Sequence, residues 1–74
     1  MAASMGDWQR INPRTYEKTI NLPDHWIAFV VVASLMANKQ WYLYINFVYM
    51  TNTPTFEALE DMVPIMINAY TRRP

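Results

Sequence analysis

Residues 23–50, PDHWIAFVVVASLMANKQWYLYINFVYM, decide the fold of this chain. From residue 25 to residue 56 the sequence carries a single formal charge, at Lys39. Apolar residues stand on both sides of the polar island Asn38–Gln40. A small domain buries only about 60% of the surface that its unfolded chain exposes. A chain of 74 residues with 53% hydrophobic residues is therefore expected to need a partner.

One long helix over about 24–49 is the first interpretation of this stretch, and it makes the fold mainly α. At 1.5 Å per residue such a helix reaches ~38 Å, enough to cross a hydrocarbon core of ~30 Å. Aromatic residues would mark the two membrane interfaces, with Trp26 at one end and Trp41, Tyr42 and Tyr44 at the other. A lysine within a span costs about 2.5–3.5 kcal/mol, so Lys39 predicts that neighbouring protein supports the helix.

A small α+β fold is the alternative, in which the same stretch forms a β-hairpin. Residues 26–36 and 41–50 are rich in Val, Ile, Phe, Tyr and Trp, which favour strands, and 37–40 would connect them. Neither run alternates cleanly, so both faces of each strand would be buried. One helix cannot cover both faces, so this fold also predicts a partner, in the first place a second copy. A hybrid, with a helix over 24–39 and a strand over 41–49, fits the pattern as well.

The C-terminal segment, 51–74, predicts an amphipathic helix over about 54–71. Thr53 is a suitable N-cap and Pro54 suits the first helical position. Apolar residues follow at helical spacing and form one stripe, at Phe56, Leu59, Val63, Met66, Ile67 and Tyr70. Pro64 removes one helical hydrogen bond and is expected to kink the helix near its middle.

The N-terminal segment, 1–22, is expected to be extended or to contain a short turn. Arg10, Arg14 and Lys18 recur every fourth residue, as on a helix face, but Pro13 argues against a continuous helix. A single helical turn starting at Arg14 is the most helix that this segment predicts. With the two segments that follow, it makes one domain over 1–74.

Few side chains in this sequence can carry chemistry. There is no Cys and one His, His25, so thiolate and His-rich metal sites are excluded. Glu57, Glu60 and Asp61 share a helix face, but a cation site needs further ligands. The formal net charge is zero, which argues against nucleic acid as a partner. The sequence thus predicts no enzyme, no metal and no cofactor.

These patterns predict an accessory structural subunit of a larger, membrane-embedded assembly. Its partners would be other protein subunits, in a hetero- or homo-oligomer, with lipid contact, in a membrane such as an organellar inner membrane. Its interaction residues would be Trp26, Lys39, Trp41, Tyr42, Tyr44, Phe56 and Tyr70. The alternative function is a soluble, cytoplasmic, homodimeric α+β module for binding or regulation.

Overall fold

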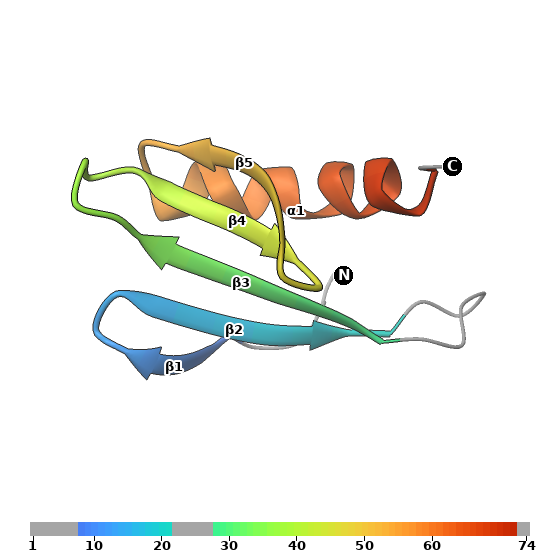
Figure 1. The fold of residues 1–74 in the computed structure, drawn as a ribbon, viewed down its shortest axis with the longest axis horizontal. Helices are drawn as coiled ribbons and strands as arrows, with labels where there is room; N and C mark the ends of the chain where they lie inside the picture. The colour runs from blue at the N-terminus through green and yellow to red at the C-terminus, as the bar shows by residue number, and fades with distance from the viewer. Residues whose placement is uncertain (1–7, 22–27, 73–74) are drawn as a thin grey trace.

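Five antiparallel strands and one helix form the part of the chain that the computed structural model describes, residues 8–21 and 28–72. The strands are neighbours in the sheet in the order of the sequence, β1-β2-β3-β4-β5. They are β1 Gln9–Asn12, β2 Thr15–Ile20, β3 Phe29–Leu35, β4 Trp41–Ile45 and β5 Val48–Thr53, followed by the helix α1, Phe56–Thr71. In Figure 1 the sheet faces the reader and α1 lies behind it.

The long apolar helix predicted for 24–49 is wrong, because the described part of this stretch forms strands. The first apolar run supplies β3, and the second supplies β4 and the beginning of β5. Branched and aromatic side chains dominate both runs and pack well on a pleated surface. Within residues 8–21 and 28–72, no helix is long and apolar enough to cross a membrane. The predicted transmembrane helix is therefore wrong, and the membrane placement built on it loses its basis.

The alternative α+β fold matches the structure, since the predicted hairpin around residues 37–40 is present as β3 and β4. In its connection Lys39 adopts φ 66°, and the Lys39 N–H donates to the carbonyl of Met36 at 2.9 Å. The sheet extends beyond this hairpin because the second apolar run turns again. Asn46 and Phe47 form that second turn, and β5 begins after it at Val48.

A further hairpin, β1–β2, replaces the helical turn that the sequence predicted from Arg14. Pro13 and Arg14 form its turn, in which the Arg14 N–H donates to Oδ1 of Asn12 at 2.9 Å. The ring of Pro13 suits a turn and cannot continue a helix. Arg10 and Lys18 consequently lie on two different strands, and their spacing of four has no helical meaning.

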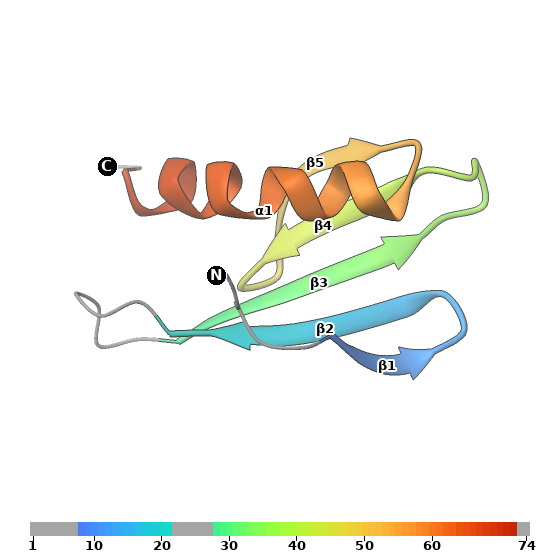
Figure 2. The ribbon, with the colours of Figure 1, turned by 180° about the vertical axis from the view of Figure 1, so that it is seen from behind.

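The core lies between α1 and one face of the sheet. Alternate residues of a strand share a face, and in β3 the residues Phe29, Val31 and Ala33 are buried. In the described chain the buried apolar core consists of Ile20, Phe29, Val31, Ala33, Leu43, Ile45, Leu59, Val63 and Ile67. Full burial of a Leu or Ile side chain contributes about 1.5–3 kcal/mol. One face of the sheet thus packs against α1, which Figure 2 shows in front of the sheet, and within the described residues the other face has no helix.

Helix α1 confirms the predicted C-terminal helix and its stripe. All six residues of the stripe lie in the core or pack against it. The helix begins later than predicted, because Thr55 is the N-cap and its side chain accepts from the Ala58 N–H at 3.1 Å. The predicted cap, Thr53, is buried instead, and its hydroxyl donates to the carbonyl of Thr55 at 2.7 Å. The helix continues through Pro64, which is exposed.

Candidate interaction surface

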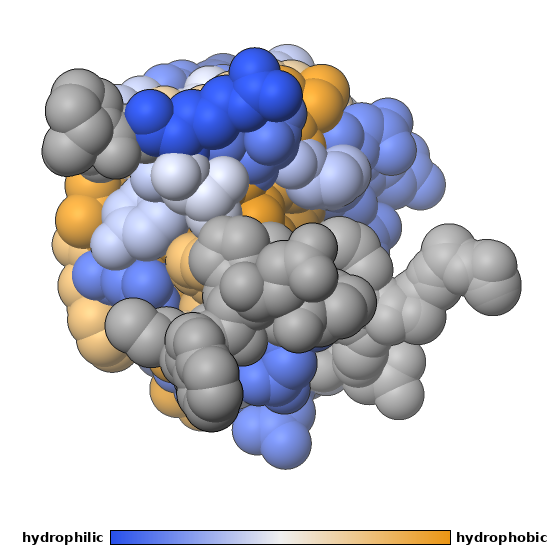
Figure 3. Space-filling model, turned by 90° about the vertical axis from the view of Figure 1, so that its right-hand side faces the viewer, coloured by the Kyte–Doolittle hydropathy of each residue, from blue (hydrophilic) through white to orange (hydrophobic). Residues whose placement is uncertain are grey.

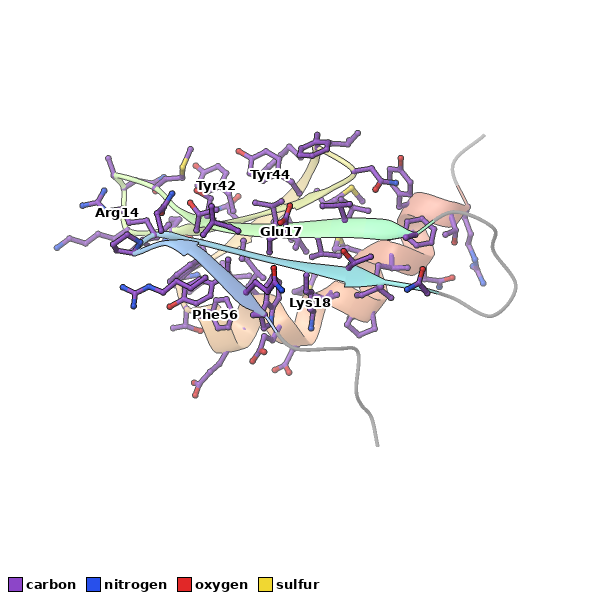
Figure 4. All side chains as sticks on the ribbon, turned by 90° about the horizontal axis from the view of Figure 1, so that it is seen from below. Arg14, Glu17, Lys18, Tyr42, Tyr44 and Phe56 are labelled. Atoms are coloured by element: carbon purple, nitrogen blue, oxygen red, sulfur yellow. The ribbon has the colours of Figure 1, made fainter. Side chains whose placement is uncertain are left out.

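The helix-free face of the sheet carries two rows of side chains that cross several strands. The register sets Glu17, Val32, Tyr44 and Tyr49 side by side from β2 to β5. A second row, from the same strands, consists of Thr15, Ser34, Tyr42 and Asn52. Figure 4 shows Glu17, Tyr42 and Tyr44 pointing away from α1, whereas Lys18 and Phe56 lie on the helix side. We define the helix-free face as these two rows together with Thr19 and Val30.

A cluster of tyrosines occupies the β4–β5 side of this face. The ring of Tyr49 lies 5.6 Å from that of Tyr42 and 6.0 Å from that of Tyr44, measured between centroids. The hydroxyl of Tyr42 accepts a hydrogen bond from Nδ2 of Asn38 at 3.0 Å. The hydroxyl of Tyr49 donates to Oδ1 of Asn52. These contacts hold the rings in place, and a rigid aromatic surface loses little conformational entropy when it binds.

Two polar groups on the same face have no hydrogen bond to any residue that the structure describes. They are the hydroxyl of Tyr44 and the carboxylate of Glu17. Glu17 is also the charged residue of this face within the described chain, where valine, tyrosine, threonine, serine and asparagine surround it. A phenol can donate and a carboxylate can accept. The helix-free face therefore offers one donor and one acceptor to a partner.

The β4–β5 turn carries an exposed aromatic ring at Phe47. Ile45 pairs with Val48, so Asn46 and Phe47 form the turn by themselves, with φ 50° and 68°. Positive φ at both central residues defines a type I′ turn, which favours Asn followed by Gly. Phe47 has a Cβ that crowds the backbone in this region. Its side chain is nevertheless 77% exposed, so the contacts of its own chain do not bury it.

Phe47 belongs to a short run of exposed apolar residues. Val48 and Tyr49 follow it and are 36% and 50% exposed. Figure 3 looks at the end of the molecule where α1 ends, and orange, hydrophobic surface follows its left margin, the side of the helix-free face. Contiguous exposed apolar surface in a small protein is typical of an interaction site.

A small cavity lies at the β1–β2 edge of the sheet, at the other end of the strand order from β5. Gln9, Glu17, Lys18 and Thr19 line it, and its volume is about 160 Å³. We call it the edge cavity. Gln9 and Glu17 are register partners, so the cavity adjoins the first row of the helix-free face.

The predicted interaction residues fall on different sides of the sheet. Tyr42 and Tyr44 lie on the helix-free face, and Lys39 is exposed in the β3–β4 connection. The other described aromatics, Trp41, Phe56 and Tyr70, pack against the core between the sheet and α1. Trp26 lies outside the described residues.

An internal aromatic cluster explains the position of Trp41 and Phe56. Their rings lie 5.0 Å apart, and the ring of Tyr16 lies 5.3 Å from that of Phe56. Trp8 joins them at 5.2 Å from Phe56, and its Nε1 donates to Oε2 of Glu60 at 2.9 Å. These rings therefore attach α1 to β2, to β4 and to Trp8, which precedes β1, within one chain.

The acidic residues on α1 do not form a metal site with other described residues. No group of three or more His, Cys, Asp or Glu within residues 8–21 and 28–72 could hold a metal ion. His25, the single histidine of the sequence, lies outside the described residues.

Several residues of the surface were not anticipated from the sequence. Glu17, Val32 and Tyr49 join the face only through strand pairing, which no local pattern revealed. Phe47 could have been found only by recognising Asn46-Phe47 as a turn without the usual glycine. No protein-family model, curated protein or solved structure matches this chain.

Proposed function

We propose that this chain is a non-catalytic binding module that works as a homodimer, with two copies joined through their helix-free faces. The observation that carries the proposal is the one-sided cover of the sheet. Helix α1 packs on one face, whereas Val30 and Val32 stand on the other with three tyrosines around them.

Burial of this face supplies the driving force for association. Val30, Val32 and Tyr44 are only half-buried in the single chain. Burying apolar surface is worth about 25 cal/mol per Å², and a standard interface removes about 800 Å² per partner from water. Two sheets pack about 10 Å apart when their side chains interdigitate. A second sheet of the same shape can therefore cover the face that α1 leaves open.

The charge of the chain also favours a second copy. Its formal net charge is zero, so two copies do not repel each other through their overall charge. Tyrosine is enriched in protein interfaces, and charged residues are depleted at the centre of interfaces. The helix-free face has this composition, with Glu17 as its charged member in the described chain.

Analytical ultracentrifugation in buffer without detergent tests the proposal. The unmodified chain is expected to sediment as a dimer at micromolar concentration. Val32→Lys places a charge at the centre of the face and is expected to give a monomer with an unchanged circular dichroism spectrum. Ile65→Lys adds the same charge at a residue of α1 that is 55% exposed, and it should leave the dimer intact. A monomeric unmodified chain, or a Val32→Lys variant that remains dimeric, would contradict the proposal.

A further inference from the structure

The register of the sheet and the position of Phe47 specify how two such copies fit together. We propose that a two-fold axis parallel to β3 relates them, and that Phe47 of each copy seats in the edge cavity of the other. This inference rests on the proposed homodimer and adds its geometry and its anchor residue.

An axis parallel to β3 pairs complementary groups. It keeps each position along the strands and exchanges the two sides of the sheet, so β4 of one copy lies over β2 of the other. Val32 pairs with Glu17 on one side and with Tyr44 on the other. Glu17 of one copy therefore faces Tyr44 of the second copy. The Tyr44 hydroxyl donates and the Glu17 carboxylate accepts, so each group gains a hydrogen bond as it leaves water.

An axis that runs across the strands lacks this pairing. It places β2 over β2, so Glu17 would face a strand that offers only two threonines and a second Glu17 on this face. The tyrosines of β4 would face each other, so the two carboxylates would lose the Tyr44 donor and have only the threonine hydroxyls of β2. Carboxylates brought together away from water repel each other. The charge of Glu17 thus favours the axis parallel to β3.

The same axis carries Phe47 onto the edge cavity. The β4–β5 turn and the cavity between β1 and β2 lie on opposite sides of β3, each about one and a half strand spacings, ~7 Å, from it. They also lie at a similar level along the strands, because Asn46 is bonded to Val30 and Val30 pairs with Thr19. Polar side chains line the cavity, and the ring would contact their aliphatic carbons.

The backbone at Phe47 gives independent support for an anchor at this position. A residue with a Cβ is strained at φ 68°, and its own chain leaves the ring 77% exposed. Strain of this kind persists only where the surrounding structure imposes it, and it is more frequent at functional sites. Contact with a second copy would explain why an aromatic residue occupies a position that suits glycine.

Cross-linking between two single-cysteine variants tests the geometry, because the chain contains no cysteine of its own. Phe47→Cys and Thr19→Cys are mixed, allowed to exchange subunits and treated with a short bis-maleimide. The mixture is expected to give at least fivefold more cross-linked dimer than either variant alone. Tyr49→Cys, which lies on the helix-free face close to the turn and keeps the Phe47 ring, is expected to behave like Phe47→Cys. Ile65→Cys, mixed with Thr19→Cys, serves as the control and should stay at background.

Equal cross-linking in the mixtures and in the single variants would overturn the axis and the seat of Phe47. The sedimentation mass of Val32→Lys shows whether the homodimer itself or only this geometry is wrong. If Val32→Lys dissociates the dimer but no mixed cross-link forms, the proposed homodimer stands and this geometry is wrong. If the unmodified chain sediments as a monomer, both the homodimer and its geometry are wrong.

Discussion

Asn46 and Val30 are joined by two hydrogen bonds that fix the β4–β5 turn to β3. The Asn46 N–H donates to the carbonyl of Val30 at 2.8 Å, and Oδ1 of Asn46 accepts from the Val30 N–H at 3.0 Å. Nδ2 of Asn46 also donates to the hydroxyl of Tyr70 at 3.4 Å. One side chain thus connects the turn, the central strand and the end of α1.

Asn46→Ala is expected to lower the free energy of unfolding by about 1–3 kcal/mol. The substitution removes the partner of the Val30 N–H and places a residue that tolerates positive φ poorly at φ 50°. Chemical denaturation measures the loss. Asn68→Ala, on the exposed side of α1, is the matched control and should be neutral or slightly stabilising. Equal stability of the two variants would contradict the structural role of Asn46.

Phe47→Gly is expected to raise the free energy of unfolding by about 1 kcal/mol, because glycine adopts positive φ without strain. Lys39→Gly relieves the same strain at φ 66° and is expected to stabilise by a similar amount. The measurement is made on a Val32→Lys background, so that dissociation of a dimer does not contribute. A fall in stability for Phe47→Gly would mean that its ring supports its own chain.

Phe56→Ala and Tyr44→Ala are expected to separate folding from association. Phe56 packs in the internal cluster, so its truncation should cost about 2–4 kcal/mol of unfolding free energy. Tyr44 lies on the helix-free face, so its truncation should cost less than half as much and weaken dimerisation at least tenfold. Thermal unfolding and sedimentation, applied to both variants, give the two numbers. The reverse ranking would show that the two faces of the sheet had been assigned the wrong roles.

The C-terminal helix was predictable because its apolar spacing has one explanation. Leu59, Val63 and Ile67 are four residues apart, and all three are buried. The predicted start was two residues too early, because the N-cap is Thr55 and not Thr53. Thr53 is buried instead, and burial is not visible in the local pattern.

The strands were not predictable with the same certainty, because both faces of the central strands are apolar. Val30 and Val32 face away from α1 and hide the alternation of Phe29, Val31 and Ala33. The turns were not predictable either. Left-handed conformations usually occur at glycine, but here Lys39 and Phe47 adopt them.

The candidate surface was half predictable. The sequence predicts Tyr42 and Tyr44 as interaction residues, and both lie on the helix-free face. The same prediction includes Trp41, although neighbouring residues of a strand point to opposite faces. Because Trp41 lies in a strand, this rule places it on the core side of the sheet, where Phe56 contacts it.

Isotope-filtered NMR on a mixture of labelled and unlabelled chains tests the central claim most directly, because it detects contacts between copies only. We expect nuclear Overhauser effects from the methyl groups of Val30 and Val32 to residues of the second copy, with Tyr44 among them. Intermolecular effects that arise only from the exposed side of α1, or none at millimolar concentration, would contradict a dimer formed through the helix-free face.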